Sequence, residues 1–213
     1  MKTRKIRTAL YNVLPGEKAH ALMAPRPKYI EGIEGVHPCP PVNSAILALI
    51  VPFENELALP LIKRVNRGKY HGGQIAFPGG KMEKEDADAL QTALRVCHEE
   101  IGVPEEKVSI LGVLSDIYIP LSNFNITPIV GTTLQLPDFI LSQDEVEKVI
   151  LVKLRDLFDD RNKTTHSFVR HDHKIIAPGY KIGENFIWGA TAMIIAELEQ
   201  LMKTNTFNHL GKL

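Results

Sequence analysis

The sequence predicts an α+β domain, and three observations lead to this prediction. The chain has 213 residues, which is about the size of one domain with short additions. Hydrophobic residues make up 44% of the chain and charged residues 23%, so it can bury a sizeable core. Apolar runs of strand length outnumber helical patterns, and one strong helical pattern lies between them, which is typical of an α+β fold rather than of repeated βαβ units.

Composition also excludes several classes of protein. The 25 basic residues balance the 25 acidic ones. A nucleic-acid-binding protein usually presents a strongly basic face, so this balance argues against that class. The longest apolar run, Ala45–Phe53, contains Pro52 and is far too short for a membrane span. The basic N-terminus is not followed by the apolar stretch of a secretory signal. With two cysteines, Cys39 and Cys97, no disulfide framework is expected, so we predict a cytoplasmic protein without nucleic-acid or membrane partners.

The expected elements begin with an N-terminal extension, residues 1–43, which contains a short helix at 5–12 followed by an extended arm. A domain is predicted over 44–203, with a C-terminal tail at 204–213. It opens with two apolar runs, Ala45–Val51 and Leu57–Lys63, which read as a hairpin that leads into a glycine-rich segment at 72–80. The glycines of that segment allow a tight turn and a close approach to a ligand.

The clearest helix follows this segment. Asp86 is expected to cap its start. A single buried stripe recurs at i, i+4, i+7 and i+11. Gly102 and then Pro104 end the helix, as a C-terminal glycine and a trailing proline do. The stripe consists of Leu90, Leu94, Cys97 and Ile101.

The rest of the domain is predicted to be mostly β-structure. Strand-like runs occupy 108–119, 126–136 and 146–154, and the polar region 159–174 reads as loops and edge strands. An amphipathic helix over 191–203 closes the domain. Trp188, which precedes that helix, is most simply a core residue, although an aromatic side chain at a pocket wall can stack on a base.

Two adjacent acids, Glu99 and Glu100, are the candidate functional residues of the predicted helix. Positions 96, 99 and 100 share a face, because residues three and four apart are neighbours. Carboxylates gathered there can bind Mg²⁺ or Mn²⁺, and Arg95 can orient Glu99 four positions later. An ordinary solvated helix face with an Arg–Glu pair is the alternative reading of the same residues.

Together, the glycine-rich segment and the acidic helix resemble the Nudix box, G-x5-E-x7-R-E-U-x-E-E-x-G-U, where U is a bulky aliphatic residue. Asp86 stands for the first glutamate of this box, and the spacer has one extra residue. Four features are similar to the coenzyme A diphosphatase branch of the family: the longer spacer, the segments 62–64 and 71–80, and the run 186–192. The likeness spans residues 44–201. The matching box residues are Gly80, Arg95, Glu99, Glu100, Gly102 and Val103.

This resemblance implies a Nudix fold, with a mixed β-sheet between helices. It also implies hydrolysis of the pyrophosphate bond of coenzyme A, or of a similar nucleoside diphosphate derivative, with Mg²⁺ or Mn²⁺ as cofactor. The partner is then a small nucleotide, and a homodimer is left open. By resemblance, metal ligands are the carbonyl of Gly80 and the carboxylates of Glu99 and Glu100, with Arg95 as the orienting residue. The substrate-binding candidates are Lys63, Arg64, His71 and Gln74.

One residue departs from the family pattern. The box has Arg-Glu at its centre, but this chain has Arg95-Val96, and valine neither binds Mg²⁺ nor accepts a proton. Another acid can take over the missing role. Glu145 is the candidate for catalysis, although a solvated loop charge is the alternative reading of this residue; Glu83, Glu85 and Glu147 are further candidates. Two further functions stay open: nucleotide binding without efficient catalysis in a regulatory role, and hydrolysis of ADP-ribose or a dinucleotide.

Overall fold

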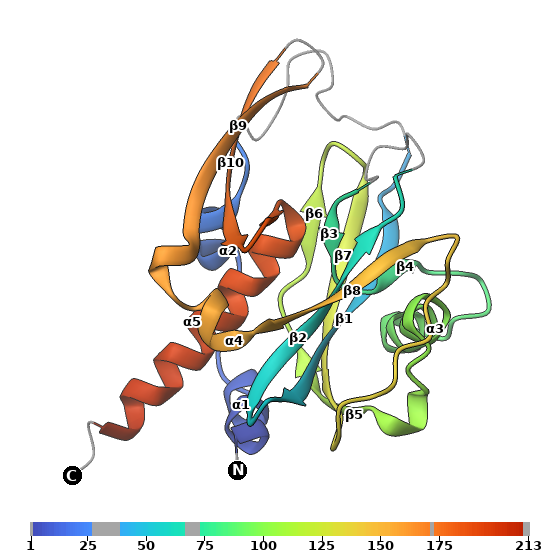
Figure 1. Ribbon diagram of the computed structural model, residues 1–213, viewed down its shortest axis with the longest axis vertical. Coiled ribbons are helices and arrows are strands. Elements are labelled where there is room, and N and C mark those ends of the chain that lie inside the picture. Colours follow the sequence, from blue (N-terminus) through green and yellow to red (C-terminus); the bar gives the residue numbers. More distant parts are fainter. Residues whose placement is uncertain (1, 27–38, 67–72, 171–172, 211–213) are drawn as a thin grey trace.

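A computed structural model describes residues 2–26, 39–66, 73–170 and 173–210. Within these residues the scaffold consists of an eight-stranded sheet and a three-stranded sheet (Figure 1). The larger sheet contains β1 (Val42–Phe53), β2 (Glu56–Arg64), β3 (Ile75–Ala76), β4 (Gly79–Lys81), β5 (Ser109–Val113), β6 (Ile117–Ile119), β7 (Phe124–Thr132) and β8 (Val146–Lys153). The smaller sheet contains β9 (Lys163–Arg170), β10 (His173–Ile182) and β11 (Asn185–Trp188).

Strand β1 is the centre of the larger sheet. It pairs antiparallel with β2 and β4 and parallel with β7, so the sheet is mixed, as predicted. Its side chains alternate between two cores. Leu47 and Leu49 face the core under α3 (Ala89–Ile101), while Ala48 and Ile50 face the core under α5 (Ala190–Leu210). Burial on both faces explains why β1 reads as a continuous apolar run rather than as an alternating one.

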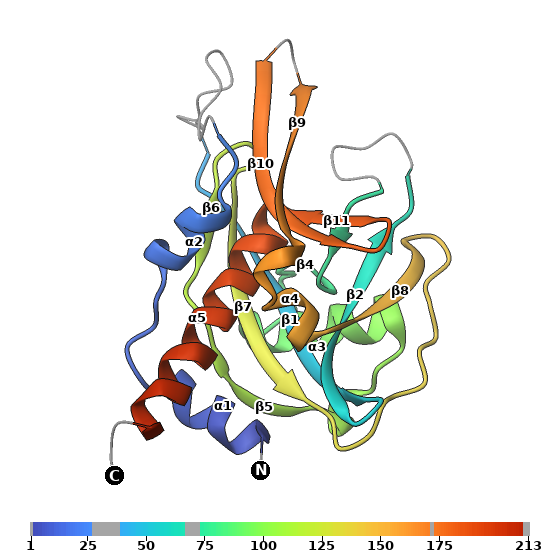
Figure 2. The ribbon, with the colours of Figure 1, turned by 60° about the vertical axis from the view of Figure 1, so that its left-hand side comes forward.

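Helices cover both faces of this sheet, which confirms the predicted α+β class. Helix α3 packs on one face, and α5 crosses the other face together with α1 (Lys2–Leu10), as the two views show (Figures 1 and 2). Helix α2 (Glu17–Met23) lies against α5, and the short helix α4 (Leu154–Leu157) follows β8. Two 3₁₀ turns, η1 (Glu105–Lys107) and η2 (Asp160–Asn162), complete the described elements.

The predicted β1–β2 hairpin is present, with its turn one residue earlier than expected. Glu54 and Asn55 form the turn with positive φ angles of 47° and 62°. Both central residues of a type I′ turn need positive φ, and this turn matches the right-handed twist of the flanking strands. Glu56, which lies before the predicted second run Leu57–Lys63, is the first residue of β2.

Three element boundaries differ from the predictions. The segment expected as an extended N-terminal arm contains α2, in which Ala19 and Met23 are buried. Helix α3 is capped by Asp88 rather than by Asp86, because the Asp88 side chain accepts the backbone N–H of Gln91. Helix α5 continues to Leu210, into the segment predicted as a tail.

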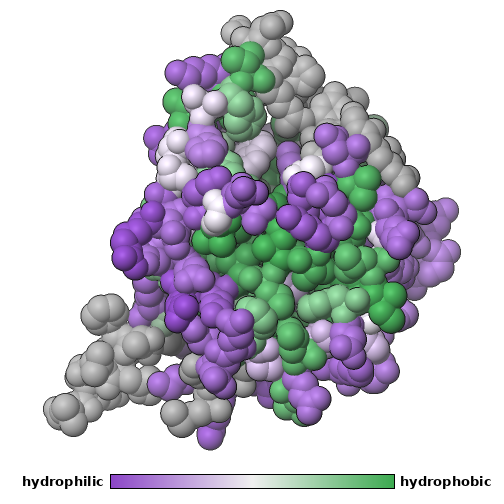
Figure 3. Space-filling model, in the orientation of Figure 1, coloured by the Kyte–Doolittle hydropathy of each residue, from purple (hydrophilic) through white to green (hydrophobic). Residues whose placement is uncertain are grey.

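The surface in the orientation of Figure 1 is mostly hydrophilic at its rim. Hydrophobic residues occupy the centre of this face, around β2 and β8 (Figure 3). Partly buried Val149 and Leu151 of β8 pack against the core under α3. None of the helices in the described part of the chain combines the length and the hydropathy that a membrane-spanning helix needs.

Candidate active site

A cavity of about 1110 Å³ lies where the glycine-rich segment meets β1, β7 and the start of α5. The segment folds back on the sheet because β3 pairs with β2 and β4 pairs with β1. An apolar wall from these strands is interrupted by a few charged groups, which is typical of a ligand pocket. The charged residues that line the cavity are Arg64, Lys81, Asp144 and Glu145.

Glu100 ties the end of α3 to this cavity. Its side chain is only 1% exposed and accepts two hydrogen bonds, one from the backbone N–H of Gly79 (2.9 Å) and one from Nη1 of Arg64 (3.0 Å). The pKa of the Glu100 carboxyl is raised to about 7, mainly by burial; the neighbouring charge of Glu145 adds to this rise, and Arg64 and Gly79 oppose it. The charged form of the Glu100 carboxylate is therefore stable only with positive charge nearby.

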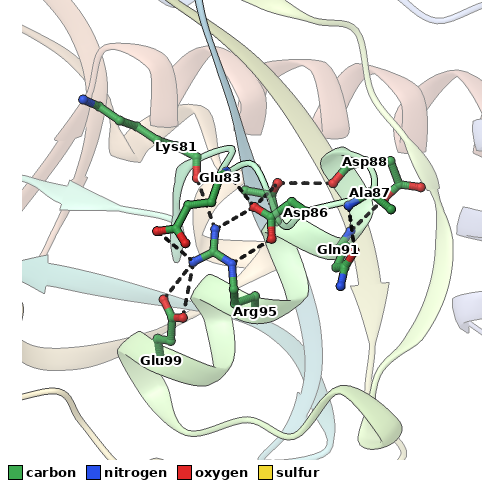
Figure 4. Close-up of polar contacts among 9 residues, drawn as sticks. Lys81, Glu83, Asp86, Ala87, Asp88, Gln91, Arg95 and Glu99 are labelled. Carbon is green, nitrogen blue, oxygen red and sulfur yellow. Dashed lines mark hydrogen bonds and ion pairs between the residues drawn. The ribbon is translucent and has the colours of Figure 1, made fainter.

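Arg95 makes its closest contacts with Asp86 rather than with Glu99 (Figure 4). Its Nε donates to one Asp86 oxygen at 2.8 Å and its Nη2 to the other at 2.7 Å. The predicted contact with Glu99 is also present, since Nη1 lies 3.1 Å from Oε2 of that exposed acid. Arg95 further donates to the carbonyl of Lys81, which links α3 to strand β4.

Asp86 is held in place by three groups. Besides Arg95, it accepts the hydroxyl of Thr92 (2.9 Å) and the backbone N–H of Glu83 (2.9 Å). The Arg95 hydrogen bonds hold the pKa of Asp86 well below its ordinary value, and they outweigh the opposing effect of burial. Asp86 thus fixes the loop before α3 instead of capping the helix.

Val96 occupies the place where the family pattern has a glutamate. It is buried, and its methyl carbon would lie 3.3 Å from a Cβ at Gly80. An acid at this position would therefore lie beside Gly80, whose carbonyl is predicted to bind the metal. The valine instead presents an apolar surface there.

The structure brings some predicted site residues to the cavity and leaves others outside it. The lining includes Arg64, Gln74, Gly80 and Glu145 but not Arg95, Glu99 or Glu100. Lys63 is not a lining residue and pairs with Glu147 at 2.7 Å. His71 lies outside the described residues.

Lys81 and Trp188 are lining residues that were not among the predicted site residues. Lys81 directly follows the glycine pair, and its ammonium lies over the ring of Phe124, 5.7 Å from the centroid. Trp188 lines the cavity from the end of β11. A sequence signal existed for both, because Lys81 follows a box residue and Trp188 belongs to the run 186–192.

The acids of α3 fit a divalent cation with one donor fewer than the family pattern. Glu99 is 55% exposed and so has oxygen lone pairs available to a ligand. Glu100 and Glu145 repel each other, and a cation between such acids relieves that repulsion. In the described part of the chain, no group of three or more His, Cys, Asp or Glu side chains is arranged to hold a metal ion.

Comparison with known families gives one match to this chain. A family model described as NUDIX domain matches residues 43–171. The uncharacterized Nudix hydrolase NudL of Enterobacter sp. (strain 638) is 34% identical over 161 residues, which cover 74% of this chain and 82% of NudL. NudL of Pectobacterium atrosepticum is 34% identical over 158 residues, which cover 73% of this chain and 80% of that protein.

Solved structures agree on the fold. A NUDIX hydrolase from Nitrosomonas europaea superposes with a TM-score of 0.50 at 20% identity, over 83% of this chain and 77% of that one. A MutT/nudix family protein from Enterococcus faecalis gives the same TM-score at 16% identity, over 84% and 71% of the two chains. At these identities the superpositions establish the shared fold.

Proposed function

We propose, from the premise that this chain belongs to the Nudix hydrolase family, that it hydrolyses the pyrophosphate bond of coenzyme A or of a similar nucleoside diphosphate derivative. The observation that supports this most is a cavity lined by two cationic side chains, one of which is paired with an acid of the box. Arg64 and Lys81 line it, and Glu100 lies directly behind Arg64. Guanidinium and ammonium groups are the common protein partners of phosphate.

Glu99, Glu100 and the carbonyl of Gly80 are the residues we assign to a divalent cation, Mg²⁺ or Mn²⁺. When bound, such an ion neutralises phosphate charge and acidifies water. Arg95 keeps Glu99 in position by donating to it while Asp86 fixes the guanidinium. The role of these side chains is thus mainly to position charge, as in other phosphoryl transfers.

Glu145 is the residue that we assign to the proton of the attacking water. It is exposed, lines the cavity and lies near Glu100. In the reaction, the water oxygen forms a bond to one phosphorus, the bond from that phosphorus to the bridging oxygen breaks, and the bridging oxygen leaves with the other phosphate. A water proton passes to the carboxylate of Glu145. Gln74, which also lines the cavity, and His71 are assigned to substrate binding together with Arg64.

Nucleotide binding without turnover is the second candidate function. Val96 favours it, because a buried valine beside Gly80 leaves the site without the acid that the family places there. Loss of a positioned general base costs about 10²–10⁴-fold in rate. A third candidate keeps hydrolysis and changes the substrate to ADP-ribose or a dinucleotide.

A substrate panel distinguishes these functions. The purified full chain is incubated with Mg²⁺ or Mn²⁺ and with coenzyme A, an acyl-coenzyme A, ADP-ribose or NADH, and the products are separated by chromatography. Selective conversion of coenzyme A to 3′,5′-ADP and phosphopantetheine supports the proposal. Binding of nucleotide in a calorimeter without turnover supports the second candidate, and cleavage of ADP-ribose or NADH alone supports the third.

A further inference from the structure

We propose that the indole of Trp188, oriented by Phe168, is the surface on which the nucleobase of the substrate stacks. This inference rests on the proposed function of the same cavity, since it assigns one lining residue of the cavity to one part of a nucleotide. It makes Trp188 a specificity-determining residue and Phe168 a positioning residue.

Trp188 is tied to the phosphate-binding side of the cavity. It is the last residue of β11, and Gly189, with φ of 66°, then turns the chain into α5. Two residues later, the hydroxyl of Thr191 donates to the carbonyl of Ile75 in β3 (3.1 Å). This buried hydrogen bond joins the turn after Trp188 to the glycine-rich segment, so the indole has a fixed place relative to Arg64 and Lys81.

The indole plane is set by neighbours in the smaller sheet. The rings of Trp188 and of Phe168 on β9 form a T-shaped pair, with centroids 4.8 Å apart and planes at 68°. Aromatic pairs in this geometry are more favourable than face-to-face pairs, and Phe168 contacts at most one face of the indole. On the neighbouring strand β10, Trp188 is paired with Gly179, which has no side chain to cover the indole.

The other aromatic residues that line the cavity are already engaged. Phe77 is only 2% exposed and belongs to the core, and Phe124 has the ammonium of Lys81 over its ring. Trp188 is half-buried, so part of its ring surface remains open to the cavity. Among the described lining residues, the indole is therefore the aromatic surface best placed for a planar ring.

A nucleobase is the occupant that fits the lining of the cavity. Cations and an aromatic face in the lining of one cavity match a molecule in which phosphates are joined to a flat ring. Every base has a π-face, and stacking on an aromatic side chain contributes about 1–3 kcal/mol per base by alanine substitution. A pantetheine or acyl arm has no such ring and would use apolar contacts only.

Trp188 is the single tryptophan of the chain, so its fluorescence reports directly on this position. The full-length protein is titrated with ADP, with inorganic pyrophosphate and with 4′-phosphopantetheine, and its emission is recorded. ADP is expected to quench the emission, and the two ligands without a base are expected to leave it nearly unchanged. Quenching by phosphopantetheine without quenching by ADP, or equal quenching by ADP and pyrophosphate, overturns the inference.

Variants test the same point by calorimetry. Trp188→Ala is expected to weaken ADP binding by about 5- to 150-fold and to leave pyrophosphate binding unchanged, with Trp188→Phe in between. Phe168→Ala is expected to reduce the ADP quench and Phe168→Tyr to restore it. Val169→Ala is the matched control, because this exposed neighbour follows Phe168 on β9 and points to the other face. Equal loss of ADP and pyrophosphate binding in Trp188→Ala contradicts the assignment.

Failure of this inference is distinguishable from failure of the proposed function. The fluorescence and calorimetric readouts need no hydrolysis, so they remain informative if the chain only binds nucleotides. Conversely, hydrolysis of coenzyme A without an ADP-specific quench supports the function and overturns the stacking role. If Trp188→Ala does not fold in a thermal melt, Trp188→Phe and Phe168→Ala decide the question.

Discussion

Val96 is the residue at which the apolar core reaches the candidate metal site. Restoring an acid there, in Val96→Glu, separates the first two candidate functions. If the site lacks an efficient general base, kcat/KM on the preferred substrate rises by about 10²-fold or more, whereas it stays unchanged if Glu145 already takes the proton. Steady-state kinetics with Mg²⁺ measure this change. Val96→Gln has the same size without the charge and should show no comparable gain. A folded Val96→Glu protein with the original rate shows that the valine is not the defect.

The role assigned to Glu145 gives a second prediction at this scale. Glu145→Gln keeps the size of the side chain but removes its ability to accept a proton, so kcat should fall by about 10²–10⁴-fold. Single-turnover kinetics separate this loss from a change in binding. Asp138→Asn, which changes an exposed acid in the same loop, is the control and should keep the parental rate. A Glu145→Gln enzyme with an unchanged kcat assigns the proton to another group.

The pairing of Asp86 with Arg95 makes stability depend on pH. The pKa of Asp86 in the folded protein lies below the ordinary value of about 4. The contribution of this carboxylate to the free energy of unfolding is therefore present above about pH 4 and is lost as the pH falls below that value. Asp86→Asn should lower the free energy of unfolding by about 1–3 kcal/mol at pH 7. Urea denaturation at pH 7 and at pH 3 should show a smaller difference from the parent at pH 3. An equal difference at both values contradicts this account.

At the scale of single residues, the sequence predicted contacts within α3 better than contacts beyond it. The spacing of four placed Arg95 next to Glu99, and that contact is present. The shorter contacts of Arg95 go to Asp86, which lies before the helix, where no periodic rule relates positions. In the same way, the spacing could not show that Glu100 meets Arg64, because that contact depends on how β2 packs beside α3.

At the scale of elements, periodicity found the main strands and helices but not their pairing. The runs predicted at 108–119, 126–136 and 146–154 correspond to β5 with β6, to β7 and to β8. The parallel pairing of β1 with β7 was not predicted, because two buried strands look alike in sequence whichever neighbour they take. Helix starts were also uncertain, since both Asp86 and Asp88 are capping residue types.

The end of α3 gives a prediction about stability. Gly102 has φ of 71°, and a Cβ there would lie 2.7 Å from Cβ of Ile140. Gly102→Ala should therefore cost more than the roughly 1–2 kcal/mol of left-handed backbone strain. Gly183→Ala is the matched control, because its φ is 57° and a Cβ there meets nothing within 4 Å. Chemical denaturation of both variants measures the difference, and equal losses contradict the predicted clash with Ile140.

At the scale of the whole molecule, the N-terminal segment is part of the folded body. Ile6, Ala9 and Leu10 of α1 are buried in the core under α5. Residues 1–43 were predicted as an extension on the basis of their loose pattern, and short helices of this kind take their stability from the surface they pack on. Their sequence alone therefore gives little indication of docking.

A buried polar cluster fastens α2 to the domain. Glu197 of α5 accepts from His20 (2.8 Å), from the hydroxyl of Ser115 (2.6 Å) and from the backbone N–H of Gly16 (3.0 Å). Burial alone would raise the pKa of Glu197, but these donors outweigh it and hold the pKa below its ordinary value. The carboxylate thus connects three segments that are far apart in the sequence.

Glu197→Gln is expected to loosen this attachment. A neutral amide has a single acceptor oxygen and cannot accept all the hydrogen bonds that the two carboxylate oxygens accept. Stability should fall by about 1–3 kcal/mol. Limited trypsin digestion should cut faster after Lys18, while the strands of the larger sheet stay intact. Glu184→Gln changes an exposed acid in the β10–β11 turn and should leave the digestion unchanged. Identical digestion of Glu197→Gln and the parent would falsify the fastening role.

The parallel pairing of β1 with β7 has a consequence for synthesis of the chain. The hydrogen bond from Thr132 to the carbonyl of Ile50 spans 82 positions. At a translation rate of about 5–20 residues per second, roughly 4–16 s pass before the ribosome has made the partner of β1. Through that interval the nascent chain carries an unpaired apolar edge that other chains can bind. Early closure of the β1–β2 hairpin pairs only the end of β1, from Val51 to Phe53, so the edge that β7 takes stays open until β7 has been made.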